Sequence, residues 1–180
     1  ASIRLSDRVL TTSDITCDEV AKDYGLPRES LGTVYNGADM EKYGGSEAAG
    51  ATIRQAYGVT DNIVIMFLGL LSMRKRIRLL LHAFARIADA HPAARLMIVG
   101  SGRGGIAGAM EALAEKLGVR NRLIMTGGVD PSETSKYLAA ADIVAIPSAY
   151  EGLPMALMET MASGKPVVAT RVSGIPEVVV

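Results

Sequence analysis

Two glutamates, Glu151 and Glu159, stand on either side of the start of a predicted helix and are the residues best suited to bind a polar ligand. Pro154 suits the first helical position and Gly164 the C-terminal cap, so the sequence predicts a helix over residues 154–163. Because this helix is apolar nearly all round, we expect it to be buried. An ionised carboxylate at Glu159 is then costly unless a hydrogen-bond donor satisfies it.

The place of Glu151 indicates what such a ligand would be. It follows the apolar run 143–146, and ligands of doubly wound sheets bind where the strands end. Backbone N–H groups at the helix start can receive a phosphate while the two acids accept hydrogen bonds from sugar hydroxyls. The candidate binding residues are Glu151, Gly152, Leu153, Pro154, Met155 and Glu159. The alternative is structural: Glu159 pairs with a lysine or arginine, and Glu151 is a surface cap residue.

A run of basic residues is the second candidate site. Gly69 ends the apolar run 63–68, and four cations then stand at the start of a helix: Arg74, Lys75, Arg76 and Arg78. Each cation there opposes the helix dipole by about 0.3 to 1 kcal/mol, and a bound phosphate would relieve this. The alternatives are a solvated basic face and a patch that touches nucleic acid.

A glycine run is the third candidate. Gly100-Ser101-Gly102-Arg103-Gly104-Gly105 follows the apolar run 95–99 and fits the three-glycine pattern of dinucleotide-binding domains. No acid closes the next strand, which ends in Met125-Thr126-Gly127, so the ribose ligand of a nicotinamide-dependent oxidoreductase is missing. We expect a tight turn that lets a nucleotide lie close to the backbone; a plain strand-to-helix turn is the alternative.

Short apolar runs alternate with stretches of helical period from residue 62 onward, which is typical of a parallel sheet wrapped by helices. The strand candidates are residues 63–68, 95–99, 123–125, 143–146 and 167–169, and the helix candidates are residues 77–90, 106–117, 132–140 and 154–163. Asp130 and Pro131 are expected to begin the third helix. One face of the first helix is expected to pack on the sheet: Leu79, Leu80, Ala83, Phe84, Ile87 and Ala88. The fold class is therefore α/β, with a doubly wound, Rossmann-like parallel sheet.

Residues 1–40 are expected to form a smaller unit, the remnant of an N-terminal domain. Its elements are expected at residues 9–13 (strand), 14–24 (helix, ended by Gly25) and 31–35 (strand, closed by Asn36-Gly37). Residues 41–61 are interpreted as a linker and a short helix, with a surface linker at 43–50 and the helix near 51–57. Residues 62–180 form the binding domain, which we expect to be truncated at its C-terminal end.

Composition excludes several classes of protein. The 19 basic and 19 acidic residues cancel, so no global field recruits nucleic acid or an anionic membrane. The single cysteine, Cys17, cannot form an internal disulfide, and we expect it to be buried in a cytoplasmic protein. No apolar run approaches the roughly 20 residues of a spanning helix, and no signal peptide is visible. No metal cluster is visible, and His82 and His91 are expected to be solvated.

The ordered set of motifs resembles family 4 glycosyltransferases, which are retaining enzymes of the GT-B fold. The run from Glu151 to Glu159 looks like their signature of two glutamates separated by seven residues, and residues 161–170 and 174–178 resemble its continuation. Residues 34–39 look like the segment that joins their two domains. The likeness covers nearly the whole chain, mainly as the donor-binding C-terminal domain.

The resemblance implies that residues 62–180 bind a nucleoside diphosphate sugar, such as a UDP-sugar or GDP-sugar. Glu151 then contacts the donor hexose and Glu159 the ribose hydroxyls, while Lys75 holds the diphosphate and offsets the negative charge on the leaving group. Lys75 and Glu151 are the catalytic candidates. Further donor contacts are expected at Gly69, Arg74, Gly100, Gly102, Thr126, Gly152, Leu153, Pro154 and Met155. No metal or cofactor is needed, and the hexose is transferred with retention of configuration.

The resemblance places the acceptor, whether a sugar, a lipid-linked molecule or a small molecule, in the missing N-terminal domain. It allows peripheral membrane contact for the full-length enzyme. The chain departs from the family pattern at three positions: Leu70 replaces an arginine, Arg76 a glycine and Arg103 a proline. Loss of the guanidinium at Leu70 removes a contact worth about 1.5 to 3 kcal/mol, and we expect Arg74 or Arg76 to replace it. The alternative function is a nucleotide-sugar-binding module or fragment without turnover.

Overall fold

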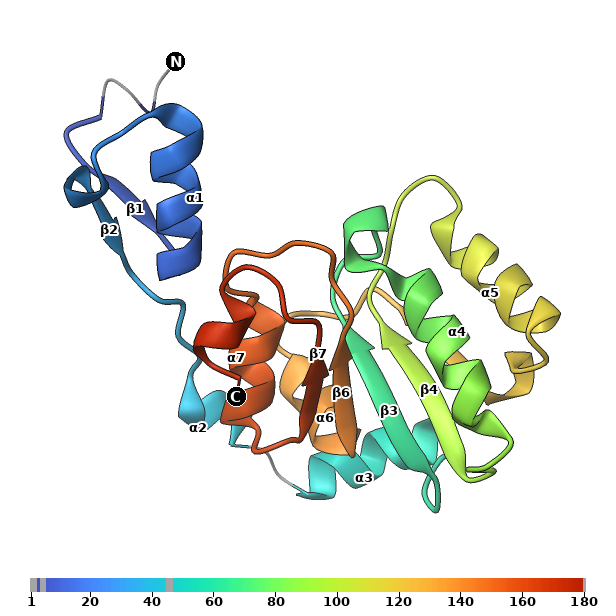
Figure 1. The fold of residues 1–180 in the computed structure, drawn as a ribbon. Helices are drawn as coiled ribbons and strands as arrows, with labels where there is room; N and C mark the ends of the chain where they lie inside the picture. The colour runs from blue at the N-terminus through green and yellow to red at the C-terminus, as the bar shows by residue number, and fades with distance from the viewer. Residues whose placement is uncertain (1–2, 4–5, 45–46, 180) are drawn as a thin grey trace.

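The computed structural model describes residues 3, 6–44 and 47–179. Its main body is a five-stranded parallel sheet in the order β5-β4-β3-β6-β7 (Figure 1). The strands are β3 (Ile63–Leu68), β4 (Ala94–Val99), β5 (Leu123–Gly127), β6 (Ile143–Ile146) and β7 (Val167–Ala169). The strand order reverses beside β3, as it does in doubly wound folds, so the predicted Rossmann-like sheet is confirmed.

Helices cover both faces of this sheet, as the unbroken apolar strands predicted. They are α2 (Met40–Tyr43), α3 (Glu47–Ala56), α4 (Ile77–Ala88), α5 (Ile106–Lys116), α6 (Thr134–Ala140) and α7 (Met155–Ala162). On one face Leu81 and Phe84 of α4 belong to the same buried cluster as Phe67 of β3. On the other face Leu138 of α6 and Leu157 of α7 belong to a second cluster. The site residues at the strand ends are therefore carried by a rigid, two-sided core.

The N-terminal unit is built on its own two-stranded parallel sheet, which stands apart from the main sheet in Figure 1. Its elements are β1 (Val9–Thr11), α1 (Asp14–Tyr24) and β2 (Leu31–Thr33). The side chain of Ser13 caps the start of α1 by accepting from the Thr16 N–H, and Gly25 ends it in the left-handed conformation with φ of 62°. Cys17, which belongs to α1, is fully buried, as predicted. The predicted strands end two residues too late, because Ser13 already belongs to the helix cap.

The sequence predicted a surface linker from residue 43 to 50, but one helix ends and another begins within this range; residues 45 and 46 lie outside the described residues. Helix α2 forms because the Asp39 carboxylate accepts hydrogen bonds from the N–H groups of Glu41 and Lys42. Helix α3 already begins at Glu47, and Gly50 lies inside it. A Cβ atom at Gly50 would stand 2.7 Å from the Ala139 backbone, so this glycine lets α3 lie directly against α6.

The start of α6 also differs from the prediction. The helix begins at Thr134, after an N-cap at Glu133 that makes no side-chain capping bond. Asp130 instead accepts hydrogen bonds from the N–H and hydroxyl of Ser132, which closes a turn before the helix. An aspartate followed by proline fits a turn as well as an N-cap, and here the turn is formed.

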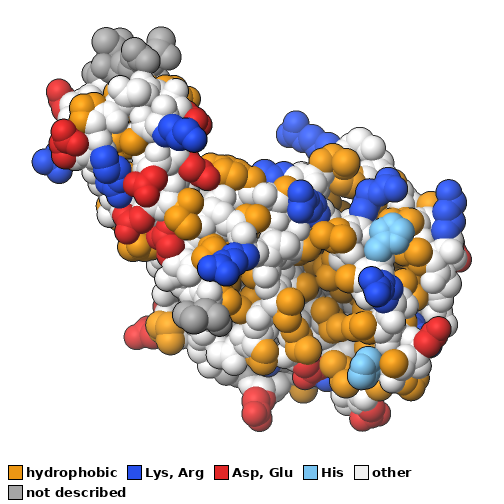
Figure 2. Space-filling model, in the orientation of Figure 1, with side chains coloured by type: hydrophobic (Ala, Val, Ile, Leu, Met, Phe, Trp, Pro, Cys, Tyr) orange, Lys and Arg blue, Asp and Glu red, His pale blue; other side chains and the backbone are white. Residues whose placement is uncertain are grey.

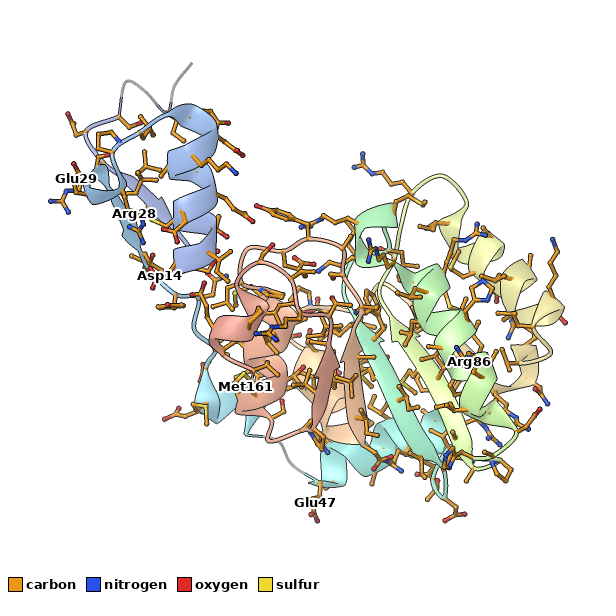
Figure 3. All side chains as sticks on the ribbon, in the orientation of Figure 1. Asp14, Arg28, Glu29, Glu47, Arg86 and Met161 are labelled. Carbon is orange, nitrogen blue, oxygen red and sulfur yellow. The ribbon has the colours of Figure 1, made fainter. Side chains whose placement is uncertain are left out.

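Two helices expose apolar side chains that the sequence predicted to be buried. On α4 the buried face contains Leu81, while Leu79 is 48% and Ile87 40% exposed. On α7 Met155 is 47% and Met161 43% exposed, so this helix is not buried all round (Figure 3). Figure 2 shows a broad apolar area on the side of the main body that faces the viewer. The buried face of α4 is therefore rotated relative to the predicted face, because the sheet packs against the side of the helix that carries Leu81.

The described ranges also contain short 3-10 helices: η2 (Arg28–Ser30), η3 (Met73–Lys75), η4 (Arg120–Arg122) and η5 (Ile175–Glu177). His82 and His91 are exposed, as predicted. Within the described ranges, none of the helices has the length and apolar character needed to span a bilayer.

Candidate functional site

The loops that follow β3 and β4 touch each other backbone to backbone at the carboxyl end of the sheet. Gly69 and Gly100 both adopt positive φ angles, of 144° and 143°. A Cβ atom at Gly100 would stand 1.9 Å from the Gly69 carbonyl oxygen, and one at Gly102 would stand 2.7 Å from Leu71. The predicted tight glycine turn is therefore present, and contacts within the protein already require these glycines.

Lys75 and Glu151 meet across this edge, from the loops after β3 and β6. The Lys75 Nζ atom lies 2.5 Å from Glu151 Oε1, and the side chains are 14% and 6% exposed. Arg74 reaches the other oxygen, with Nη1 3.3 Å from Oε2, but its side chain is 53% exposed. Glu151 is therefore a buried carboxylate held by two cations, and the alternative that it is a surface cap residue is wrong.

The backbone also joins these two loops. The Ala149 N–H donates to the Arg74 carbonyl at 2.8 Å, and Arg74 Nη1 donates to the Tyr150 carbonyl at 3.3 Å. The cations of η3 thus have an anion beside them, and that anion is Glu151. Because Arg74 and Lys75 face a single carboxylate, the three side chains carry a net charge of about +1 at neutral pH.

Arg76 ends η3 in the left-handed region, with φ of 48° and ψ of 40°. A side chain disfavours this conformation, whereas glycine adopts it freely. The arginine therefore stands where the backbone suits a glycine. Its side chain is exposed and lies directly before α4, whose N-cap makes no side-chain hydrogen bond.

Glu159 lies in α7 and has a different partner. Its Oε1 atom accepts a hydrogen bond of 2.8 Å from the hydroxyl of Tyr43, which is 6% exposed. Burial, together with this hydrogen bond, raises the pKa of Tyr43. Among the described contacts none joins Glu159 to Glu151, to Lys75 or to another cation. Sequence reasoning missed Tyr43 because it assigned this residue to a linker.

Two further residues that the sequence did not single out hold the loop before α7. The Leu153 N–H donates to Thr12 Oγ1 at 3.1 Å, and the Leu153 carbonyl accepts from Asn36 Nδ2 at 2.6 Å. Pro154 has no N–H, so two of the four positions 152–155 offer no free donor in this arrangement. Asn36 lies in the segment that suggested a domain junction, but nothing in the sequence indicated its contact with Leu153.

The remaining candidates lie where the strands end, without a shared contact. Thr126 donates to the carbonyls of Ile98 and Gly127, at 3.3 and 2.9 Å. Leu70, directly after Gly69, is 64% exposed. Among the described residues no group of three or more His, Cys, Asp or Glu side chains could hold a metal ion.

A family model described as Glycosyl transferases group 1 matches residues 51–180, which is more than half of the chain. The chain belongs to this family. The match covers the whole five-stranded sheet and the Lys75–Glu151 pair. The family model identifies the chain as a group 1 glycosyl transferase and does not identify family 4.

Relatives in the glycosyltransferase family cover nearly the whole chain. An uncharacterized glycosyltransferase of Methanocaldococcus jannaschii is 33% identical over 177 residues, which are 97% of this chain and 45% of the relative. A D-inositol 3-phosphate glycosyltransferase of Segniliparus rotundus is 31% identical over 173 residues, which are 95% of this chain and 38% of the relative. The chain thus spans less than half the length of these curated relatives.

Solved structures agree with this assignment. The Anabaena protein HepE in complex with UDP-glucose has a TM-score of 0.88 and 28% identity, over 97% of this chain and 48% of that chain. WaaG, a glycosyltransferase involved in lipopolysaccharide biosynthesis, has a TM-score of 0.83 and 25% identity, over 94% and 46% of the two chains. The fold of this glycosyltransferase chain is therefore that of the C-terminal half of a GT-B protein.

Proposed function

We propose that the protein to which this chain belongs transfers a hexose from a nucleoside diphosphate sugar to an acceptor with retention of configuration, as family 4 glycosyltransferases do. The observation that carries the proposal is the buried Lys75–Glu151 pair at the carboxyl edge of the sheet. Ligands of doubly wound sheets bind at that edge. The similarity to HepE, whose structure contains UDP-glucose, supports a nucleoside diphosphate sugar as the donor.

Lys75 and Arg74 are suited to hold a diphosphate. Both precede α4, so an anion bound to them also lies near the free N–H groups of a helix start. When the glycosidic bond breaks, negative charge grows on the leaving nucleoside diphosphate. A fixed cation beside it stabilises the transition state more than the ground state, which is how Lys75 would act as a catalytic residue.

Glu151 is suited to hold the hexose. Its carboxylate is buried beside Lys75, where a sugar hydroxyl can donate a strong, charge-assisted hydrogen bond. Binding of the diphosphate would draw Lys75 partly away and leave Glu151 oxygen lone pairs for the sugar. The Lys75–Glu151 ion pair would thus become two separate contacts to one donor molecule.

Glu159 is proposed to bind the ribose hydroxyls. The Tyr43 hydroxyl occupies Oε1 and fixes the carboxylate, while no contact among the described residues occupies Oε2. A ribose hydroxyl can donate to that second oxygen. Gly69, Gly100, Gly102 and Thr126 would line the nucleotide part of the donor at the neighbouring strand ends.

Arg74 is the better placed replacement for the arginine missing at Leu70. It is half exposed and already faces the site, so its guanidinium can turn to a phosphate at little cost. Arg76 is exposed and follows the same turn. Alanine at both positions should therefore lower nucleotide affinity, and unchanged affinity would contradict this role.

The positive charge of Lys75 and Arg74 would allow transfer without a metal ion, and a chelator should leave the rate unchanged. We propose that the acceptor, a sugar, a lipid-linked molecule or a small molecule, binds a domain that precedes this one. We further propose a cytoplasmic enzyme, with peripheral membrane contact where the acceptor is lipid-linked.

Calorimetric titration of UDP, GDP and ADP into the whole chain tests the donor site. We expect one nucleoside diphosphate to bind, and Lys75→Gln to weaken it by about 10-fold or more, the effect of losing one charge-assisted contact. Arg78→Gln is the matched control, since it removes a charge from the same basic run at an exposed position without a described partner. Equal affinity of both variants would contradict the site.

Turnover is tested with the corresponding nucleotide sugar. Slow hydrolysis that Glu151→Gln abolishes would support the transferase. Binding without hydrolysis would favour the alternative, a nucleotide-sugar-binding module. Tighter binding of a nicotinamide dinucleotide than of any nucleoside diphosphate would contradict both and return the glycine run to its dinucleotide interpretation.

A further inference from the structure

The loop that carries Glu151 is held from both sides. Lys75 and Arg74 hold it from the main domain, as described above. From the N-terminal unit, Thr12 and Asn36 bond to the backbone of Leu153, and Glu19 Oε2 accepts from the Tyr150 hydroxyl at 3.3 Å. Residues 150–153 have no helix or strand of their own, so these contacts decide where the loop lies.

The contact at Leu153 is built for close approach. Leu153 is 3% exposed, and both polar groups of its backbone are satisfied by side chains of the N-terminal unit. A Cβ atom at Gly152 would stand 2.6 Å from Thr12 Oγ1. A Cβ atom at Gly174 would stand 2.5 Å from both Ser13 Cβ and the Gly152 carbonyl oxygen, to which the Gly174 N–H donates. Glycine at both positions therefore lets the unit reach the backbone of the loop.

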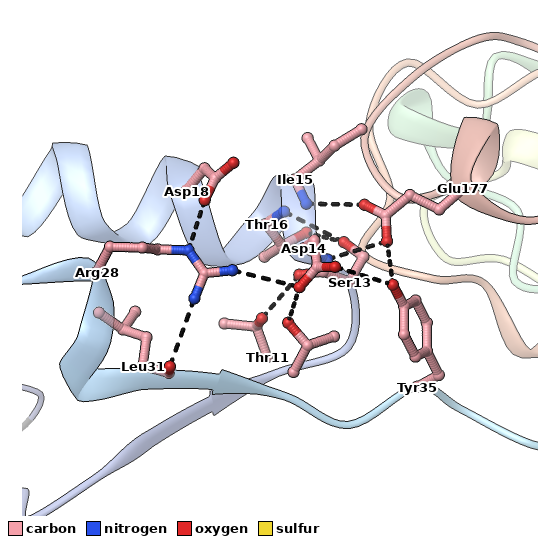
Figure 4. A network of polar contacts seen from close by, with 11 residues as sticks. Thr11, Ser13, Asp14, Ile15, Thr16, Asp18, Arg28, Leu31, Tyr35 and Glu177 are labelled. Atoms are coloured by element: carbon pink, nitrogen blue, oxygen red, sulfur yellow. Dashed lines mark hydrogen bonds and ion pairs between the residues drawn. The ribbon is translucent and has the colours of Figure 1, made fainter.

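A second contact anchors the same unit. The Glu177 carboxylate accepts from the N–H groups of Asp14 and Ile15, at 3.0 and 2.7 Å, and so caps the start of α1 (Figure 4). The Tyr35 hydroxyl donates to the same carboxylate at 2.9 Å. An acidic side chain at a helix start is stabilised by the free N–H groups and the helix dipole. The N-terminal unit thus contacts the main domain at two places, at Leu153 and at Glu177.

We propose that Thr12 and Asn36 are positioning residues that hold the Leu153 backbone and thereby set Glu151 against Lys75. The placement of the N-terminal unit then controls the geometry of the donor site. The consequence for binding rests on the proposed function above, in which Glu151 contacts the hexose. The structural part does not depend on a donor, because it concerns only the loop and the ion pair.

Thr12→Val and Thr12→Ser test the role of the hydroxyl. Valine has nearly the shape of threonine but cannot accept from the Leu153 N–H, whereas serine can. By amide-resolved hydrogen exchange we expect the Leu153 amide to exchange about tenfold faster in Thr12→Val, and at the wild-type rate in Thr12→Ser. Thr33→Val is the matched control, because its hydroxyl bonds Asp14 within the unit and does not touch the loop.

Asn36→Asp tests the other side of the same peptide. It keeps the shape of asparagine but replaces the donor with a carboxylate oxygen facing the Leu153 carbonyl. We expect exchange at residues 150–153 to rise further in the double variant with Thr12→Val. A melting curve of each variant separates this local effect from general unfolding.

The second measurement is the affinity for UDP and for UDP-glucose. If GDP or ADP binds better than UDP, that nucleotide and its glucose conjugate are used instead. Loss of one hydrogen bond should weaken the sugar conjugate by about 3- to 10-fold and free UDP by less than about 2-fold, because Glu151 faces the hexose. If nothing binds but exchange rises as expected, the positioning role stands and the donor function fails. If UDP-glucose binds while Thr12→Val and Asn36→Asp change neither exchange nor the affinity ratio, the positioning role is wrong. Tighter binding of UDP-glucose by Thr12→Val would also overturn it, since Thr12 would then compete with the donor.

Discussion

Two carboxylates connect separate loops of this molecule, in opposite environments. Glu151 is 5% exposed and faces Lys75, whereas Glu177 joins Tyr35 and Asp14 in a network of exposed contacts (Figure 4). If Glu151 loses its partner, its buried charge cannot be solvated. At Glu177, water and salt can replace the lost partner. Acidic residues beside a turn therefore do different tasks here. Burial makes Glu151 part of a site, whereas Glu177, which is only partly buried, caps a helix and docks one unit on another.

The largest difference should appear when each carboxylate loses its partner. Lys75→Met leaves Glu151 buried with only Arg74 beside it and should lower the free energy of unfolding by about 3 kcal/mol. Tyr35→Phe, which removes a donor from Glu177, should have a far smaller effect. Urea unfolding measures both. Replacing the pair together, as Lys75→Met with Glu151→Leu, should recover most of the loss, and no recovery would mean that packing rather than charge is responsible.

Each region also contains one described non-glycine residue in the left-handed conformation. Replacing either residue with glycine should stabilise the protein. Arg76 has φ of 48° and Ser173 has φ of 44°. We expect Arg76→Gly and Ser173→Gly each to raise the free energy of unfolding by up to about 1 kcal/mol. Only Arg76→Gly should change nucleotide affinity, because it alone removes a cation. Arg76→Ala is the control for charge, and a gain as large as that of glycine would show that backbone strain is not the cause.

The exposed network should respond to pH at both ends of the scale. Hydrogen bonds to Glu177 and Asp14 raise the pKa of Tyr35 to about 12. The stabilisation from this tyrosine is complete below pH 10 and is lost as the pH rises from 10 to about 12. A tyrosinate absorbance titration measures it, since Tyr35→Phe should remove one late-titrating group. An unchanged titration above pH 11 would contradict the network.

At low pH, the stabilisation that depends on Asp14 changes with pH in the opposite direction to that of Tyr35. The hydrogen bond from Thr33 is the first cause that lowers the pKa of Asp14, and contacts with Tyr35 and Arg28 add to it. A lowered pKa means that this contribution is present above the ordinary value of 3.8 and is lost as the pH falls through the lower value. Urea unfolding of the wild type and of Asp14→Asn measures this change, because the stability difference between them should shrink as the pH falls through the lowered pKa of Asp14.

Salt should give the smallest effect, again in one region only. Raising NaCl from about 0.05 M to about 0.5 M shortens the screening length well below the reach of exposed charges. The Ile15 amide, bonded to Glu177, should exchange somewhat faster, whereas the Ala149 amide, bonded to the Arg74 carbonyl, should not change. Equal responses would mean that the two regions are equally solvated.

The strands were predictable almost to the residue, while the helix faces and the links between units were not. The runs 63–68, 143–146 and 167–169 match β3, β6 and β7 because parallel strands covered by helices need unbroken apolar residues. Burial on both faces was wrong for the edge strand β7, where Val168 is 66% exposed. The face of α4 was only partly right, since apolar residues lie at more positions than the sheet can cover: Leu80, Phe84 and Ala88 are buried as predicted, whereas Leu79, Ala83 and Ile87 are exposed. Tyr43 was missed because its helix is fixed by Asp39 and by packing on α7, which leave no periodic pattern in four residues.

For the site, the resemblance to family 4 glycosyltransferases named Lys75 and Glu151 but not their contacts. Glu159 was expected beside them, and the structure gives it Tyr43 as a partner instead. Thr12 and Asn36 could not be found, because each is an ordinary turn residue in its own segment and acts 141 and 117 positions away. The roles of all these residues in donor binding stay predictions.

By itself the sequence determined the alternation of strands and helices, and therefore the edge at which Lys75 and Glu151 lie, because hydrophobic periodicity and helix caps act over a few residues. Only the tertiary structure decided which charges are buried, that Glu151 pairs with Arg74 and Lys75, and that the N-terminal unit holds the Leu153 backbone. Burial and hydrogen-bond partners depend on chain segments that lie far apart in the sequence, 77 residues for Arg74 and Glu151 and 141 for Thr12 and Leu153, and such separations carry no local pattern.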